Sequence, residues 1–296
     1  MKRVFFIVGP TATGKSELAA AVAQRIGAEI VSADAFQIYR GLDLLTAKPD
    51  PATLAKAPHH LIGAVPLSEE MNAEKYRAMA EEIIARDKPV IVVGGTGLYV
   101  KALTHGLATL PGANSTLREK LEGTTSEELF RSLCALDPEG AAKVDRQNRR
   151  RLIRAVEVCL LTGKSFSSQR VEWSQSLPEN GVLVTRERTE LYARIDRRVE
   201  EMFAAGVVEE VRAVKDLGST AEKTLGLREI RALLADEISQ AECIAKIQQA
   251  TRRYAKRQLT WFQRQTNFAS LNLSAHRPAE AVELISQSAS RVFARG

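Results

Sequence analysis

The chain has 296 residues, 45% hydrophobic and 26% charged, which is ordinary for a globular protein with a sizeable core. Three cysteines, Cys134, Cys159 and Cys243, lie far apart in the sequence, which excludes a disulfide scaffold or a cysteine-rich zinc site. The net charge of +6 at pH 7 is compatible with a polyanionic partner but does not identify one.

The sequence gives no sign of export or of membrane insertion. No apolar run reaches the ~18 residues that would cross a bilayer. The apolar run that follows the first residues is too short for a signal peptide. We therefore expect a cytoplasmic protein without a membrane segment, in which each cysteine is a small core residue.

The first predicted elements flank a glycine-rich loop. Residues 4–8 are typical of a buried parallel strand, and the alanine-rich segment from Glu17 favours a helix. Such a strand, loop and helix aim backbone N–H groups at a phosphate, to which a lysine adds charge and a serine offers a hydroxyl for Mg²⁺. The loop between them fits the pattern G-x-x-x-x-G-K-[ST] and reads Gly9, Pro10, Thr11, Ala12, Thr13, Gly14, Lys15 and Ser16. The chain is therefore predicted to bind a diphosphate or polyphosphate.

A second strand is predicted over 29–32, and Asp34 follows it. In open α/β sheets, ligands gather at the carboxyl ends of the strands, where Asp34 would lie. A carboxylate beside a phosphate site can hold Mg²⁺ or accept a proton from a nucleophile. The alternative for Asp34 is a helix N-cap or a surface position.

The pattern continues with a short strand or connection at 59–62, a helix over 72–86 and a strand over 89–93. Strands that alternate with helices predict an α/β fold, a parallel P-loop NTPase-like sheet flanked by helices. The strand over 89–93 ends in glycines, where ATPases and GTPases usually carry a metal-binding aspartate. Nucleotide hydrolysis is therefore disfavoured.

Residues 113–177 show helical periodicity and are predicted to form an all-helical insertion domain. The core is then 1–112 together with 178–296, with a strand at 181–185, a long helix from Glu190 and a largely helical C-terminal part. The densest basic run, from Arg146 to Arg154, lies in the insertion. Clustered guanidinium groups suit a phosphate backbone, although such runs are more often solvated helix faces.

Seven segments in register resemble the tRNA dimethylallyltransferase (tRNA isopentenyltransferase) family over nearly the whole chain. They are residues 9–16, 32–41, 46–49, 58–61, 93–99, 148–151 and 256–262. The resemblance implies transfer of a dimethylallyl group from dimethylallyl diphosphate to N6 of the adenosine immediately 3′ of the anticodon. The tRNAs concerned read codons beginning with U, and diphosphate is released. It also implies Mg²⁺ as cofactor and the tRNA anticodon stem-loop as partner, with no obligatory protein partner.

The resemblance also assigns roles to residues. Asp34 would be the general base, with Thr96 near the target nucleotide and Lys15 on the departing diphosphate. Residues 9–16 would cradle the donor, and Ser16 would contact the metal. The extruded adenosine would meet Asp34, Ala35, Phe36, Gln37 and Thr96. Further tRNA contacts are implied at Leu117, Gln147, Asn148, Arg149, Arg150 and Arg151.

Several of these positions leave alternatives open. Gln37 is available for hydrogen bonds to a base edge, whereas we expect Phe36 to fill the core rather than to stack on a base. Thr11 and Thr13 either contact the diphosphate or only fill the loop. A second basic helix carries four cations, which suit a tRNA face or a solvated face: Arg252, Arg253, Lys256 and Arg257.

The chain departs from the family pattern at four positions, which puts substrate fine-tuning in doubt but not the reaction class. Ala35 replaces a common serine, Leu45 a glycine and Gly63 an aspartate, and Leu227 stands where Gly-Tyr is typical. No Cys/His zinc module like that of eukaryotic members follows the last helix, so we expect a bacterial-type enzyme.

Two other functions remain open from the sequence. A small-molecule kinase of the nucleoside or shikimate type would share the phosphate loop and Asp34, but it would not need a basic helical insertion. A non-catalytic RNA-binding or ATP-sensing module is disfavoured by the intact Lys15, Ser16 and Asp34.

Overall fold

The computed structural model describes residues 3–108, 110–169 and 177–294. The chain divides into two compact units, which we call the sheet unit (residues 1–104 and 175–296) and the helical unit (105–174). The helical unit begins before the expected boundary at 113, and two hydrogen bonds explain why. Arg154 donates to the Pro111 carbonyl at 2.8 Å, and the Asn114 N–H donates to Glu157 at 2.9 Å, so this connection is tied to the helical unit.

The strands of the described residues form one sheet in the order β3-β2-β4-β1-β5-β6, in which all neighbours are parallel. Every residue of β1, β2 and β4 is buried, as expected for a sheet that helices cover on both faces. The strands are β1 (Val4–Val8), β2 (Glu29–Ala33), β3 (His59–His60), β4 (Val90–Gly94), β5 (Gly181–Thr185) and β6 (Ala269–Asn272).

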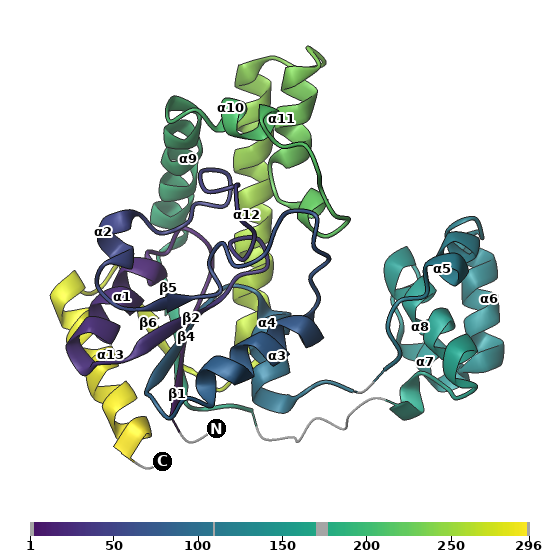
Figure 1. Ribbon diagram of the computed structural model, residues 1–296, viewed down its shortest axis with the longest axis horizontal. Helices are drawn as coiled ribbons and strands as arrows, with labels where there is room; N and C mark the ends of the chain where they lie inside the picture. The colour runs from purple at the N-terminus through teal and green to yellow at the C-terminus, as the bar shows by residue number, and fades with distance from the viewer. Residues whose placement is uncertain (1–2, 109, 170–176, 295–296) are drawn as a thin grey trace. The chain divides into compact units, whose positions relative to one another are not determined.

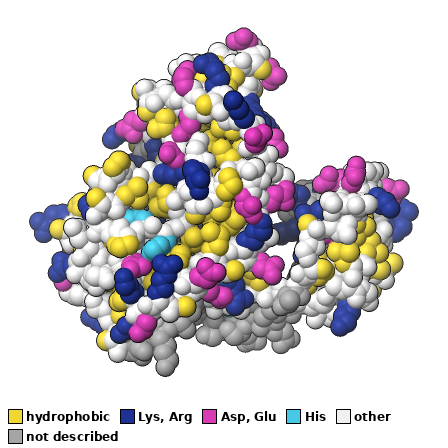
Figure 2. All heavy atoms as spheres, in the orientation of Figure 1, with side chains coloured by type: hydrophobic (Ala, Val, Ile, Leu, Met, Phe, Trp, Pro, Cys, Tyr) yellow, Lys and Arg dark blue, Asp and Glu magenta, His cyan; other side chains and the backbone are white. Residues whose placement is uncertain are grey.

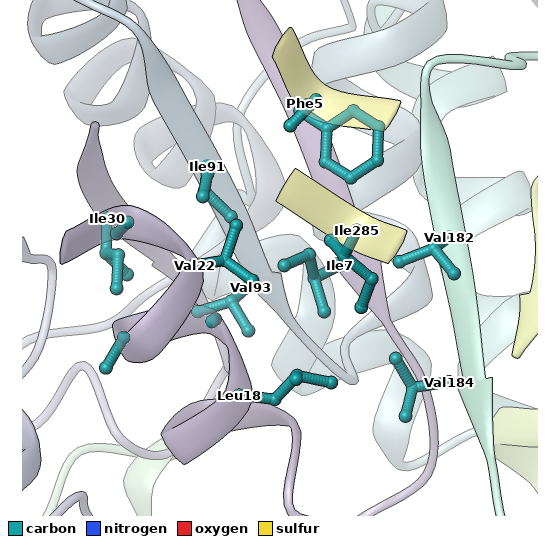
Figure 3. Packing of buried hydrophobic residues seen from close by; sticks show 14 of the residues in the cluster. Phe5, Ile7, Leu18, Val22, Ile30, Ile91, Val93, Val182, Val184 and Ile285 are labelled. Carbon is teal, nitrogen blue, oxygen red and sulfur yellow. The ribbon is translucent and has the colours of Figure 1, made fainter. Parts of the chain in front are cut away.

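One face of the sheet is covered by α1 (Lys15–Ile26) and α13 (Pro278–Ala294), which lie against each other in Figure 1. Leu18 and Val22 of α1 and Ile285 of α13 meet alternate residues of the strands, as Figure 3 shows. Ile7 and Ile91 at the centre of this layer are fully buried. Each such side chain contributes about 1.5–3 kcal/mol through burial of apolar surface. This packing fixes the strand that leads into the glycine-rich loop.

The helices of the sheet unit follow the predicted order closely. The helix predicted over 72–86 is α3 (Ala73–Ile84), and the Asn72 side chain caps it by accepting from the Lys75 N–H. The short strand β6 was not predicted, because it has only four residues and only two of them, Ala269 and Leu271, are apolar. The other helices are α2 (Pro51–Leu54), α4 (Gly97–His105), α9 (Arg188–Ala204), α10 (Val207–Arg212), α11 (Leu227–Leu234) and α12 (Gln240–Gln265).

The helical unit has its own core, formed by apolar side chains from the four α-helices of its described residues. Cys159 lies in this core and Cys243 in a core of the sheet unit, as expected. Cys134 is exposed, so the expectation of a core position was wrong there, since it occupies the outer face of an amphipathic helix. The helices are α5 (Ser115–Glu122), α6 (Ser126–Leu136), α7 (Pro138–Lys143) and α8 (Arg149–Thr162).

The order of the strands in the sheet reverses at β1. The chain passes from β1 to β2 and β4 on one side of it, then returns to β5 on the other side. In open α/β sheets such a reversal leaves a crevice at the carboxyl ends of the strands, where ligands bind. Among the described residues, no helix is both long and apolar enough to cross a membrane.

Candidate functional site

The loop of residues 9–16 adopts a strained and tightly packed conformation between β1 and α1. Gly14 caps α1 with a φ of 91°, and Ala12 has a φ of 64°, a left-handed conformation that costs a non-glycine residue about 1–2 kcal/mol. A Cβ at Gly9 would lie 2.3 Å from the Val184 carbonyl oxygen. The loop therefore needs glycine where it meets β5, and strain of this kind is typical of a functional site.

Three arginines that the sequence reasoning missed hold this loop from the side of α9. The Nε of Arg186 donates to the Thr13 carbonyl and the Nε of Arg194 to the Ala12 carbonyl, both at 2.8 Å. Arg198 donates to the Thr11 hydroxyl at 2.9 Å, and its buried Nε has no partner among the described residues. For two of them the signal was present, because Arg194 and Arg198 are four residues apart, which places their side chains on one face of α9.

Lys15 lies half-buried below the loop and donates to the Pro10 carbonyl at 3.2 Å. Burial lowers the pKa of Lys15 to about 8, although the nearby Asp34 carboxylate opposes this by favouring the charged form. Burial likewise lowers the pKa of Arg198, again against the effect of Asp34. The site therefore gathers partly desolvated cations around one carboxylate, an arrangement that is suited to an anionic ligand.

Asp34 is held in a defined position at the end of β2. Its Oδ1 accepts the N–H of Phe36 at 2.9 Å and the N–H of Gln37 at 3.2 Å. Its Oδ2 has no hydrogen bond to any described residue, so one carboxylate oxygen is left for a ligand. Thr96 supports this turn from β4, because its hydroxyl accepts the Ala35 N–H at 2.9 Å.

Asp34 lies between two pockets of the sheet unit. The first pocket is mainly apolar beyond Thr11, Asp34 and Arg198, with walls from α9, α10, α11 and α12 that include Met202 and Phe203. The second pocket is polar and is lined by residues of the glycine-rich loop, β2 and the 59–62 segment: Lys15, Ser16, Ser32, Asp34, Gln37 and His59. An anionic group and an apolar group could thus lie on either side of one carboxylate.

The structure brings together the sequence-predicted residues 9–16, Asp34 and Thr96. Phe36, Gln37 and Thr13, however, have positions or contacts other than those that the sequence suggested. Phe36 is half-buried on the wall of the apolar pocket, so the expectation that it fills the core was wrong. The Gln37 amide donates to the carbonyls of Thr46 and Ala47 at 3.2 and 2.9 Å. The fully buried Thr13 donates its hydroxyl to the Pro10 carbonyl at 2.9 Å and so serves the loop itself.

Some residues of the basic run in the helical unit make contacts within the unit, whereas others are exposed. Arg149 donates to the Glu122 carbonyl at 2.7 Å and to the Thr124 carbonyl at 2.5 Å, so it holds the turn between α5 and α6. Arg150 and Arg151 are exposed, as is Gln147. Asn148 caps α8 by accepting the Arg151 N–H at 3.2 Å, and the Leu117 side chain packs on the core of the unit. Arg146 stacks over Phe130, with 3.9 Å between its Cζ and the ring centroid.

Figure 2 shows how charge is distributed on one face of the molecule. Lysine and arginine side chains are scattered over both units in this view and are interspersed with acidic ones, whereas hydrophobic side chains gather over the middle of the sheet unit. Charge distribution on this face therefore does not locate a polyanion surface by itself.

Residues 37–265 match the sequence profile of the family described as IPP transferase. A tRNA dimethylallyltransferase 1 of Citrifermentans bemidjiense is 46% identical over 271 residues, which cover 88% of this chain and 89% of that protein. A tRNA dimethylallyltransferase of Akkermansia muciniphila is 43% identical over 264 residues, covering 88% and 90%.

Solved structures agree with these sequence comparisons. The full-length tRNA isopentenylpyrophosphate transferase of Bacillus halodurans is 31% identical, with a TM-score of 0.70 over 99% of this chain and 98% of that one. A eukaryotic dimethylallyltransferase solved acting on tRNA has a TM-score of 0.79 over 96% of this chain and 77% of that one. Its identity is 24%, so this second likeness concerns the fold alone.

Proposed function

This chain belongs to the IPP transferase family, and from that premise we propose how its own residues carry out the transfer of a dimethylallyl group to tRNA. The chain is a transferase that modifies tRNA. We place the reaction at N6 of the adenosine immediately 3′ of the anticodon, in tRNAs that read codons beginning with U. One observation carries the proposal: Asp34 borders both the apolar pocket and the pocket of the phosphate-binding loop.

The diphosphate of the donor would bind at the phosphate-binding loop (residues 9–16). Lys15 and Arg198 supply positive charge there, and the N-terminus of α1 adds the positive end of a helix dipole. When the bond between C1 of the dimethylallyl group and the diphosphate oxygen breaks, these groups stabilise the negative charge that develops on the leaving oxygen. The loop thus cradles a leaving group rather than an energy donor.

The dimethylallyl group would occupy the apolar pocket. Side chains of α9 and α10 line it, among them Val199, Met202 and Val207. Burial there excludes water from a carbon that becomes electrophilic as the diphosphate departs, so hydrolysis of the donor is suppressed. Phe36, on the wall of the same pocket, would border both the prenyl group and the incoming base.

Asp34 would accept the proton from the adenine amine. The lone pair of N6 is delocalised into the ring, so the amine attacks C1 well only if a base takes its proton as the new N–C bond forms. The Oδ1 of Asp34 is engaged by two backbone N–H groups, which leaves Oδ2 to receive that proton. Thr96 fixes the same turn through the Ala35 N–H.

Mg²⁺ fits the polar pocket as a partner of the diphosphate. Ser16 and Asp34 line this pocket, and the described residues contain no cluster of three or more His, Cys, Asp or Glu side chains that could hold a metal alone. That donor set suits Mg²⁺, which keeps several waters and binds substrate phosphates. The Ser16 hydroxyl would hold the ion, which when bound would neutralise charge on the diphosphate.

A labelling experiment separates this function from that of a small-molecule kinase. The purified protein is incubated with dimethylallyl diphosphate labelled in its prenyl group or with ATP labelled in its terminal phosphate, each with and without bulk tRNA. We expect prenyl label to enter tRNA and no phosphoryl label to be transferred. Transfer of phosphate to a small acceptor, without prenyl transfer, would instead establish the kinase.

The pH dependence of donor capture should report the ionisation of Lys15. Its pKa of about 8 means that the ammonium is charged below this pH and loses its charge above it. We expect kcat/KM for the donor, measured at saturating tRNA, to fall as pH rises through about 8. In Lys15→Arg the side chain stays charged, so this inflection should vanish. An inflection that persists in Lys15→Arg belongs to another group and contradicts the assignment.

Arg150 and Arg151 are the exposed cations through which the helical unit would bind the anticodon arm. The double variant Arg150→Ala/Arg151→Ala should weaken tRNA binding. Each lost phosphate contact should lower the slope of log Kd against log salt concentration by roughly 0.7–0.9. Filter binding at several salt concentrations measures this, and the donor KM should not change.

Arg149 is excluded from this variant because it holds the turn between α5 and α6. The matched control is Lys120→Ala/Arg131→Ala, which removes two exposed cations of the same unit at positions where no tRNA contact is implied. Equal slopes for the test variant, the control and the unmodified protein would show that Arg150 and Arg151 lie on a merely solvated face.

A further inference from the structure

Gln258 of α12 joins two segments of the site that are distant in the sequence. Its Oε1 accepts the N–H of Thr11 in the phosphate-binding loop at 2.9 Å, and its Nε2 donates to the Gly95 carbonyl after β4 at 3.0 Å. The residue is 5% exposed, so these bonds are shielded from water. A single buried amide thus fixes the spacing between the loop and the turn that carries Thr96.

The surrounding chain is shaped to admit this amide. A Cβ at Gly95 would lie 2.1 Å from the Nε2 of Gln258, and a Cβ at Gly97 would lie 2.4 Å from the Trp261 ring. The glycines after β4 therefore let α12 approach closely. Tyr254, one turn before Gln258 on the same helix, places its phenol near the side chains of Thr96 and Gln258.

We propose that Gln258 is a positioning residue for the donor, a role that rests on the proposed function. By holding the Thr11 N–H from behind, it keeps the phosphate-binding loop in the conformation in which its remaining N–H groups and Lys15 face the diphosphate. Through Gly95, the residue next to Thr96, the same amide ties that conformation to the turn after β4, and Thr96 in turn supports the Asp34 turn. The positions of the donor site and the acceptor site relative to each other are thereby fixed.

This role needs an amide because the Oε1 and the Nε2 of Gln258 form hydrogen bonds of opposite direction. One end must accept a hydrogen bond and the other must donate one, and among side chains of this length that are ordinarily uncharged at neutral pH only glutamine does both. Methionine has the same length and fills the space but makes neither bond. An ionised glutamate accepts from Thr11 but faces the Gly95 carbonyl with a second acceptor, whereas a protonated glutamic acid can reproduce both bonds.

The test measures binding of inorganic pyrophosphate, which requires neither tRNA nor transfer. We expect Gln258→Met to raise the pyrophosphate Kd and the donor KM by about tenfold, the effect of losing two buried hydrogen bonds that orient the loop. The tRNA Kd should stay the same. Gln249→Met, the same substitution at an exposed position of α12, is the matched control and should match the unmodified protein.

Gln258→Glu supplies a readout that a purely structural role would not move. Relative to the unmodified protein at the same pH, its pyrophosphate Kd should be raised at about pH 8. It should recover to within about threefold at about pH 5.5, where the buried carboxyl is protonated. This comparison remains valid even if Gln258→Met does not fold.

Two results would overturn the role of Gln258. One is an unchanged pyrophosphate Kd in folded Gln258→Met. The other is a loss in Gln258→Glu that is equal at both pH values. Failure of the proposed function is distinguishable from either, because it would appear in the unmodified protein as absence of prenyl transfer or of pyrophosphate binding.

Discussion

Replacing Asp34 with Asn should slow turnover by about 10²- to 10⁴-fold, the usual contribution of a well-positioned general base. The asparagine side chain keeps the shape of aspartate, and its carbonyl oxygen can still accept the N–H groups of Phe36 and Gln37. The turn should therefore persist while the affinity for a proton is lost. Single-turnover transfer with saturating tRNA and donor measures this effect directly.

The Asp34→Asn variant should also change the behaviour of Lys15. The Asp34 carboxylate favours the charged form of Lys15, so its neutralisation should lower the lysine pKa below about 8. The fall of donor kcat/KM with pH should then begin at lower pH than in the unmodified protein. Turnover is best compared near pH 6.5, where Lys15 keeps its charge in both proteins. The difference in turnover at this pH then measures the loss of the base alone.

The control is Asp216→Asn, which removes one exposed carboxylate of the same unit. It should leave turnover, the tRNA Kd and the pH profile unchanged. Near-normal single-turnover transfer in Asp34→Asn would eliminate Asp34 as the base and would leave it only the structural task of ordering the turn after β2.

Local pattern was sufficient to predict the parts of this molecule that depend on neighbours in the sequence. The apolar runs of β1 and β4 are continuous because both faces of the sheet are buried, and this was visible as unbroken hydrophobicity. The loop of residues 9–16 was recognisable because its pattern lies between a strand and a helix. Asp34 was placed correctly at the end of β2, because carboxyl ends of parallel strands share one edge.

Contacts between distant segments were not predictable in this way. Arg194 and Arg198 meet the phosphate-binding loop only because β5 pairs with β1, which delivers the start of α9 to the same edge. The engagement of Arg149 with carbonyls of the α5–α6 turn depends on how α8 packs, so composition alone suggested a free cation. Phe36 was expected in the core because hydrophobicity does not distinguish a core from a pocket wall.

Replacing Lys15 with Ala should reduce kcat/KM for the donor by at least about 10²-fold, comparable to removal of one preorganised donor from an oxyanion site. The ammonium lies half-buried in the polar pocket, with Asp34 beside it, so water cannot replace its charge at the departing diphosphate. Initial rates with varied donor and saturating tRNA measure the loss. The tRNA Kd should be unchanged, and Lys56→Ala, which removes an exposed lysine of the same unit, should behave normally.

A competition experiment completes this prediction, because it asks what the loop binds. If the loop cradles the leaving group, inorganic pyrophosphate should compete with the donor in the unmodified protein and lose most of its affinity in Lys15→Ala. Transfer should proceed fully without any nucleoside triphosphate, since the energy comes from the allylic diphosphate itself. An obligatory requirement for ATP hydrolysis would contradict this assignment, because the same N–H groups, Lys15 and Ser16 would then be occupied by the nucleotide during transfer. Independence from ATP, together with competition by pyrophosphate, would leave the donor diphosphate as the ligand of residues 9–16.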